Sequence, residues 1–196
     1  MAKARAISGI DAHTLTSTNA RIIARTRLEE MKTWGQYAHD PQRSDELHDL
    51  RIAAKRLRYT LEIFSDVLPE ESSSIIEEVT QIQEELGALH DSDVMVALLH
   101  LCLEQQQNGT SNAHHRRTQA EEAQRKAGKH LISNLELVTY LLDAHTAPTQ
   151  VQRVGLERLL RNTRQQREEQ YRVFREHWDQ LQGRNFHQEV LDLLNA

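Results

Sequence analysis

Apolar side chains recur at alternating intervals of three and four residues between Leu47 and Leu68. The positions are Leu47, Leu50, Ala54, Leu57, Leu61, Phe64 and Leu68. An α-helix has about 3.6 residues per turn, so this interval places all of these side chains on one face of a helix. The segment is therefore predicted to be a helix that buries one face, with a cap at Ser44 and an end at Pro69.

A second segment has the same rhythm, at Ile75, Val79, Ile82, Leu86 and Leu89. It predicts a helix that begins after the serines at 72–74. Gly87 and the polar segment His90–Asp93 are expected to bend or interrupt this helix before the apolar run Val94–Leu103 resumes it.

The other helices are predicted from their caps and breakers. A first helix is expected from a cap at Ser17 or Thr18 to about Ala38, with Arg21 and Arg25 on one side and Leu28, Met31 and Trp34 towards a core. A long helix is expected from about Gln150 to Leu181, and a short one after Gly183 that ends near Leu194.

The composition favours one fold class. The chain has only 7 glycines and 3 prolines in 196 residues, too few for the many turns of a β fold. We therefore expect an all-α bundle of long antiparallel helices. Its length predicts a single domain over 1–196, with 1–15 flexible and 105–150 forming an insert or loop plus an irregular helix.

The sequence also predicts a location. The lone Cys102 cannot form an internal disulfide, which fits a reducing compartment. The N-terminal segment lacks an apolar core of signal-peptide length, and no stretch approaches the roughly 20 apolar residues of a membrane span. We expect a cytoplasmic protein with no membrane partner, no metal and no cofactor.

The most informative segment for function is a row of basic residues. His48, Arg51, Lys55 and Arg58 fall within a sector of about 80° on the predicted helix and climb about 15 Å along it. A chain of phosphates is a line of negative charge, which this row would complement. The net charge is −5, but the range 51–58 contains no acidic residue, and the local face meets the ligand. The alternative is a solvated basic face or ion-pair partners for the acidic third helix.

A second polar stretch is the sequence RNTRQQREEQ at Arg161–Gln170, which has no apolar side chain although the helix is apolar on both sides of it. A helix inside a bundle should supply core residues there. The stretch either lines a wet, charged cavity, with Arg161 and Arg164 facing it, or protrudes into solvent. Arg21 and Arg25 are further, weaker candidates for the same ligand.

Two motifs resemble a known family. LHDLRIAAKRLRYTLEIF at Leu47–Phe64 and IQEELGALHDSDV at Ile82–Val94 are similar to the conserved histidine α-helical domain, the CHAD family. FREHWDQL and NFHQEVLDLL resemble the end of that domain. The resemblance implies an all-α bundle with a basic surface or pore, binding of inorganic polyphosphate and no catalytic activity. It implies the basic row as the binding residues, with Arg56 and Tyr59 completing the motif.

The resemblance also implies partners. They are a triphosphate-processing (CYTH-type) or polyphosphate-metabolising enzyme, and polyphosphate granules. The family usually carries two copies of its four-helix module around a basic central pore, whereas this chain has one, similar to the C-terminal copy. We therefore expect a homodimer that rebuilds the pore. Its seam is expected at Val94–Leu103 or at the stripe of Phe186, Val190, Leu191 and Leu194.

Two other classes of function stay open. His48, the doublet His90-Asp91 and Asp143 loosely match the H…HD…D set of metal-dependent phosphohydrolases, in which they would hold a divalent metal. Asp91 is equally explained as the cap of a following helix. The basic face could instead lie along a nucleic-acid backbone, or the chain could be a helical adaptor, although aromatic residues for stacking single strands are missing.

Overall fold

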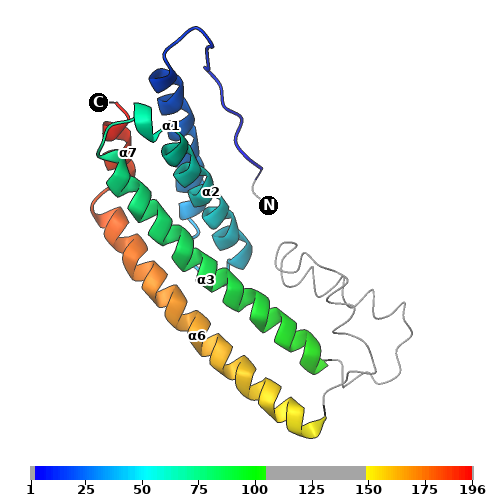
Figure 1. Ribbon diagram of the computed structural model, residues 1–196. Coiled ribbons are helices and arrows are strands. Elements are labelled where there is room, and N and C mark those ends of the chain that lie inside the picture. The colour runs from blue at the N-terminus through cyan, green and yellow to red at the C-terminus, as the bar shows by residue number, and fades with distance from the viewer. Residues whose placement is uncertain (1–2, 105–148, 196) are drawn as a thin grey trace. The chain divides into compact units, whose positions relative to one another are not determined.

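The computed structural model describes residues 3–104 and 149–195, and every regular element in these ranges is a helix (Figure 1). The elements are α1 (Thr16–Gly35), α2 (Ser44–Ile63), the 3₁₀ helix η1 (Ser65–Val67), α3 (Ser72–Glu104), α6 (Gln150–Gly183) and α7 (Phe186–Leu193). The five α-helices of the described part pack antiparallel, which confirms the predicted fold class. The predicted insert lies almost entirely outside the described residues.

The chain divides into two compact units, which are described separately. The first contains Met1–Gly87 and Tyr171–Ala196, and the second contains Ala88–Gln170. Both α3 and α6 contribute to each unit. The single domain expected from the length stays a prediction.

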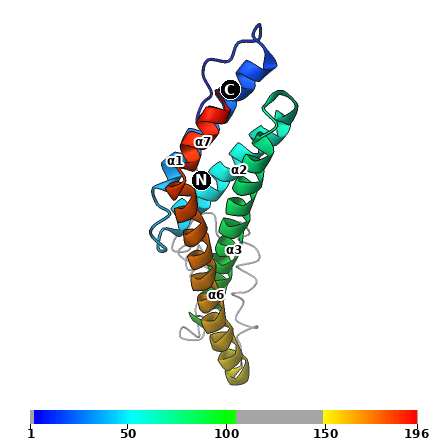
Figure 2. The same ribbon diagram turned by 90° about the vertical axis from the view of Figure 1, so that its left-hand side faces the viewer.

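The predicted apolar stripes form the core of the first unit. Side chains that are at most 8% exposed include Leu28, Met31, Leu47, Leu50, Ala54, Leu57, Leu61, Leu68, Ile75, Val79, Ile82 and Leu86. Helices α1 and α2 lie side by side, joined by a short loop at 36–43 (Figures 1 and 2). Phe64 and Trp34 depart from the prediction because both are only half-buried. Phe64 does so because α2 ends at Ile63 and η1 turns the chain towards Leu68.

Helix α7 and the end of α6 complete this core. Phe174, Trp178, Leu181, Phe186, Val190 and Leu194 are at most 5% exposed. The indole of Trp178 lies so close to α1 that a Cβ on Gly35 would be 2.5 Å from its ring. The turn before α7 places Asn185 in the left-handed region, with φ of 59°. Because Phe186, Val190 and Leu194 are buried in their own unit, they are not an exposed dimer seam. That part of the prediction is wrong.

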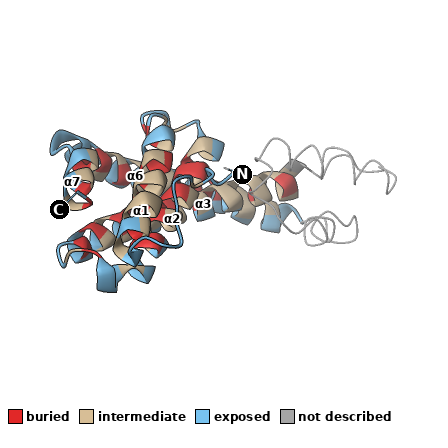
Figure 3. Ribbon diagram, turned by 90° about the horizontal axis from the view of Figure 1, so that it is seen from above, coloured by how far each residue is buried: buried red, intermediate tan, exposed pale blue. Residues whose placement is uncertain are grey.

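The predicted helix caps are also wrong. Helix α1 begins at Thr16, so Ser17 and Thr18 lie inside its first turn, and its N-cap residue Leu15 makes no side-chain cap hydrogen bond. Helix α2 begins at Ser44 itself, with Arg43 as an N-cap that makes no such bond either. Figure 3 shows that buried and exposed positions alternate along these helices, so burial of one face is the main source of their stability.

A histidine joins α3 to α6 in the first unit. The Nε2 of His177 lies 3.0 Å from an oxygen of Glu78, and its Nδ1 lies 3.0 Å from an oxygen of Glu85. Arg184 pairs with Glu78 at 2.9 Å. Burial alone would lower the pKa of His177, but the hydrogen bonds and charges of Glu85 and Glu78 outweigh it and raise that pKa above 6.5. Burial would raise the pKa of Glu78, but its bonds to His177 and Arg184 lower it below 4.5.

We expect the stability of the protein to depend on this cluster in both pH directions. The raised pKa of His177 means that its contribution is complete below pH 6.5 and is lost as the pH rises through the folded-state value. The lowered pKa of Glu78 means that its contribution is present above pH 4.5 and is lost as the pH falls. The Tm of the wild type should therefore fall on going from pH 6 to pH 8.5, and His177→Gln should reduce that fall. An identical fall in the variant would contradict this assignment.

The second unit is held partly by a polar seam between α3 and α6. Arg167 forms an ion pair with Asp93, and the hydroxyl of Ser92 donates to Gln170 at 2.7 Å. Arg164 contacts the ring of His100. This seam accounts for Arg167 and Gln170 in the polar stretch Arg161–Gln170, whereas Arg161 and Arg164 are exposed.

The same seam corrects the prediction of a break in α3. The helix runs without interruption through Gly87 and His90–Asp93. Asp91 is therefore not the cap of a new helix. The polar stretches His90–Asp93 and Arg161–Gln170 each interrupt an apolar pattern in the sequence. They face one another in the structure, so each supplies hydrogen-bond and ion-pair partners for the other.

One helix in the described residues, Ser72–Leu103, is long and apolar enough to cross a membrane by length and composition alone. This corrects the expectation that no stretch approaches that size. A core helix passes the same test, and Ile75, Val79, Ile82, Leu86 and Leu89 of this helix are at most 2% exposed. We therefore assign it as a core helix.

Candidate functional site

The predicted basic row lies on α2 beside its buried stripe. His48, Arg51, Lys55 and Arg58 are all half-buried, so none of them extends freely from the surface. They occupy successive turns of one uninterrupted helix. The helix therefore fixes their order and spacing, as the sequence predicted. We call these four residues the basic row.

Arg51 has the most informative surroundings in the basic row. Its Nε is buried and has no hydrogen-bond partner among the described residues. The guanidinium lies against α3: a Cβ on Gly87 would be 3.4 Å from Nε and 3.9 Å from Nη2. Arg51 forms no ion pair with any described residue. An unmade hydrogen bond of a buried donor costs roughly 1–3 kcal/mol, so an anion that accepts this hydrogen bond would be stabilised here.

Arg58 and Lys55 flank the ring of Tyr59. The Cζ of Arg58 lies 4.8 Å from the ring centroid and the Nζ of Lys55 lies 5.5 Å from it, distances typical of cation–π contacts. The Nε of Arg58 is 3.3 Å from Glu62, without the geometry of a hydrogen bond. Lys55 forms no ion pair with a described residue. Tyr59 thus holds two cations of the row in place, and only one of them has an acidic neighbour.

Two other candidates make structural contacts. Arg56, which the helical periodicity places away from the basic row, forms an ion pair with Glu30. Glu30 is 4% exposed and also pairs with Arg27 at 2.9 Å. Arg25 donates to the backbone oxygen of Leu194 at 3.1 Å, so it ties α1 to the end of α7. For Arg56 and Arg25 a part in anion binding stays a prediction.

The remaining weaker candidates for polyphosphate binding are Arg21, Arg161 and Arg164. Arg21 is half-buried, and its Nε is buried without a hydrogen-bond partner in the described ranges. Arg161 is exposed and Arg164 contacts His100, both in the second unit. None of the three makes an ion pair with a described residue. Their part in binding also stays a prediction.

The structure adds two residues of α3 that the sequence analysis did not assign to the site. Gly87 lies under Arg51, where a larger side chain would displace the guanidinium. Gln83 lies one turn earlier on the same face of α3, and its Oε1 is buried without a hydrogen-bond partner among the described residues. The only signal in the sequence was that both lie in the IQEELGALHDSDV motif. No spacing rule connects that motif to Arg51.

The metal-dependent alternative gains no support from the described residues. Within 3–104 and 149–195, no group of three or more histidine, cysteine, aspartate or glutamate side chains is arranged to hold a metal ion. Asp143, the last member of the H…HD…D set, lies outside the described residues. His48 and His90 lie on different helices, α2 and α3.

Comparison with known families assigns a family to the part of the chain that contains the basic row. The model of one family, described as the CHAD domain, matches residues 4–100. This part of the chain belongs to the CHAD domain family. No curated protein and no solved structure matches the chain.

The CHAD match covers α1, α2 and most of α3. It therefore contains the whole basic row together with Gln83 and Gly87. The C-terminal segments FREHWDQL and NFHQEVLDLL, whose similarity was noted from the sequence, lie beyond it. In this CHAD domain the candidate site is formed by α2 and by the face of α3 that carries Gly87.

Proposed function

We propose that this CHAD domain binds inorganic polyphosphate, or a similar phosphate-rich polyanion, through the basic row on α2, and that it does not catalyse a reaction. The observation that carries the proposal is the guanidinium of Arg51. It lies across Gly87 with a buried donor that lacks an acceptor and with no acidic partner among the described residues. An anionic oxygen would supply both the acceptor and the charge.

The arrangement of the row favours a linear polyanion over a single small anion. Its residues follow each other at intervals of three and four, so the cations repeat at roughly one per helical turn, about 5.4 Å apart along the axis. Each cation can then meet a different phosphate of one chain. Gln83 and Gly87 of α3 would lie beside Arg51 as a second wall.

Tyr59 favours polyphosphate over single-stranded nucleic acid. Its ring already makes cation–π contacts with Arg58 and Lys55, so a base that stacks on the ring would compete with these cations. Helix α2 carries no other tyrosine, phenylalanine or tryptophan on which a base could stack. Binding of a phosphodiester backbone remains the second candidate, and competition between polyphosphate and DNA separates the two.

The wider expectations belong to the same proposal. They are a cytoplasmic location with association to polyphosphate granules, and a functional link to a triphosphate-processing or polyphosphate-metabolising enzyme. The homodimer that would complete a basic pore also stays a prediction. Of its two expected seams only Val94–Leu103 is still a candidate, and Met95 there is 44% exposed.

We expect the affinity for polyphosphate to fall steeply with salt. The three permanent cations of the row, Arg51, Lys55 and Arg58, displace counterions from a polyanion, so binding should weaken on the order of tens of fold between 50 and 200 mM salt. The measurement is calorimetry with long-chain polyphosphate at several salt concentrations. An affinity that does not change with salt would contradict binding through the basic row.

A further inference from the structure

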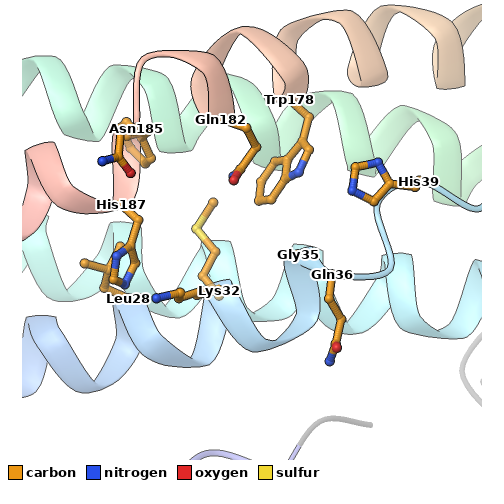
Figure 4. A pocket seen from close by; sticks show the side chains of 11 residues that line it. Leu28, Lys32, Gly35, Gln36, His39, Trp178, Gln182, Asn185 and His187 are labelled. Carbon is orange, nitrogen blue, oxygen red and sulfur yellow. The ribbon is translucent and has the colours of Figure 1, made fainter.

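A pocket of about 350 Å³ opens in the first unit between α1, the end of α6 and the start of α7 (Figure 4). No residue of the basic row lines it. Its floor consists of apolar side chains that are 2–5% exposed: Leu28, Met31, Trp178 and Phe186. Its rim is polar and is formed by Lys32, Gln36, His39, Gln182, Asn185 and His187.

The permanent charge on the described lining of the pocket is positive and belongs to Lys32. The described residues that line it include a lysine and two histidines but no acidic residue. Lys32 has no ion-pair or hydrogen-bond partner in the described part of the chain. The nearby carboxylate of Glu29 is engaged by His187, whose Nε2 lies 2.7 Å from it. The mouth of the pocket therefore offers an uncompensated cation next to an apolar floor.

A close contact between Gly35 and Trp178 shapes the floor of the pocket. Trp178 can form its wall only because Gly35 has no side chain, since a Cβ there would lie 2.5 Å from the indole ring. Figure 4 shows that the side chain of Gln182 points into the opening from α6 and faces α1 across it. Amide groups at this rim can donate hydrogen bonds to an anionic head while the floor contacts an apolar body.

We propose that this pocket binds a small organic anion with a flat apolar body, such as an aromatic carboxylate, sulfonate or phosphate ester. The volume lies at the lower end of the range of about 300–1,000 Å³ found for ligand sites, which suits a ligand of one or two rings. Inorganic polyphosphate has no apolar surface to cover the floor. The pocket is therefore a second site, independent of the basic row.

The test uses anilinonaphthalene sulfonate, an aromatic anion, as the probe, and calorimetry and fluorescence on the whole chain. We expect saturable binding of one probe per chain. Lys32→Gln removes the cation and Gln182→Glu places a negative charge in the opening with almost no change of shape. Each should weaken binding by about three- to tenfold. Gln180→Glu is the matched control, because Gln180 is an exposed residue of the same helix that does not line the pocket.

The result that overturns the proposal is equally definite. It is the absence of saturable binding, or binding that Lys32→Gln and Gln182→Glu affect no more than Gln180→Glu does. The two pocket variants should bind polyphosphate as the wild type does, and a variant with reversed charges at Arg51 and Arg58 should bind the probe as the wild type does. These controls therefore distinguish a pocket that does not bind the aromatic anion from a basic row that does not bind polyphosphate.

Discussion

Reversing the charges of Arg51 and Arg58 together should weaken polyphosphate binding at least about 100-fold. Each hydrogen bond to a charged group contributes roughly 1.5–3 kcal/mol, and every 1.4 kcal/mol is a factor of ten in affinity. The glutamates would also repel the polyanion. The double variant Arg51→Glu/Arg58→Glu is compared with the wild type by calorimetry, and circular dichroism follows its helix content.

The matched control reverses two arginines outside the proposed site. Arg43 and Arg172 are exposed surface residues of the first unit whose ion pairs are with neighbours on the surface. The double variant Arg43→Glu/Arg172→Glu changes the net charge equally. If it weakens binding as much as the first pair does, the total charge and not the basic row determines affinity. If helix content falls in Arg51→Glu/Arg58→Glu but not in the control, Arg51 and Arg58 instead stabilise the fold.

A side chain at Gly87 should weaken binding without touching a charged residue. At Gly87→Ala the new Cβ would lie 3.4 Å from the Nε of Arg51, an ordinary contact, so affinity should change little. At Gly87→Leu the atoms beyond Cβ occupy the place of the guanidinium. Arg51 must move, and affinity should fall by about tenfold or more, close to the loss in Arg51→Ala. Polyphosphate affinity should therefore be similar with glycine or alanine at position 87 and should drop with leucine.

Gly155 provides the control for the glycine series. It also lies inside a helix, α6, but a Cβ there would meet nothing within 4 Å. Replacing either glycine by alanine should raise helix stability by roughly 0.5–1 kcal/mol. Gly155→Leu should leave polyphosphate affinity unchanged. An equal loss of affinity in Gly155→Leu and Gly87→Leu would show that the effect does not pass through Arg51.

The helices were predictable because their signal is local and repeated. The stripe from Leu47 to Leu61 and the stripe from Ile75 to Leu89 are both buried as the periodicity requires. The order of the basic row follows from the same periodicity. Helix starts were less predictable, because neither α1 nor α2 begins with the side-chain cap that the sequence suggested.

What the sequence could not reveal depends on pairing between helices. The segment His90–Asp93 was expected to bend or interrupt a helix, and Arg167 lay in a polar stretch without core residues. The ion pair between Asp93 and Arg167 links the two segments. Gly87 was expected, together with His90–Asp93, to bend or interrupt α3, whereas the helix is continuous and the guanidinium of Arg51 lies against Gly87. A single sequence carries no information that links two such positions. The candidate residues on α2 could therefore be proposed from it, whereas Gln83 and Gly87 on α3 could not.

The most direct test of the central claim is a calorimetric titration of the wild-type chain with long-chain polyphosphate at low salt, with sulfate and DNA as controls. The account predicts saturable binding of polyphosphate, weaker binding of DNA and little binding of sulfate. Absence of polyphosphate binding, or binding that DNA matches at equal phosphate concentration, would contradict it.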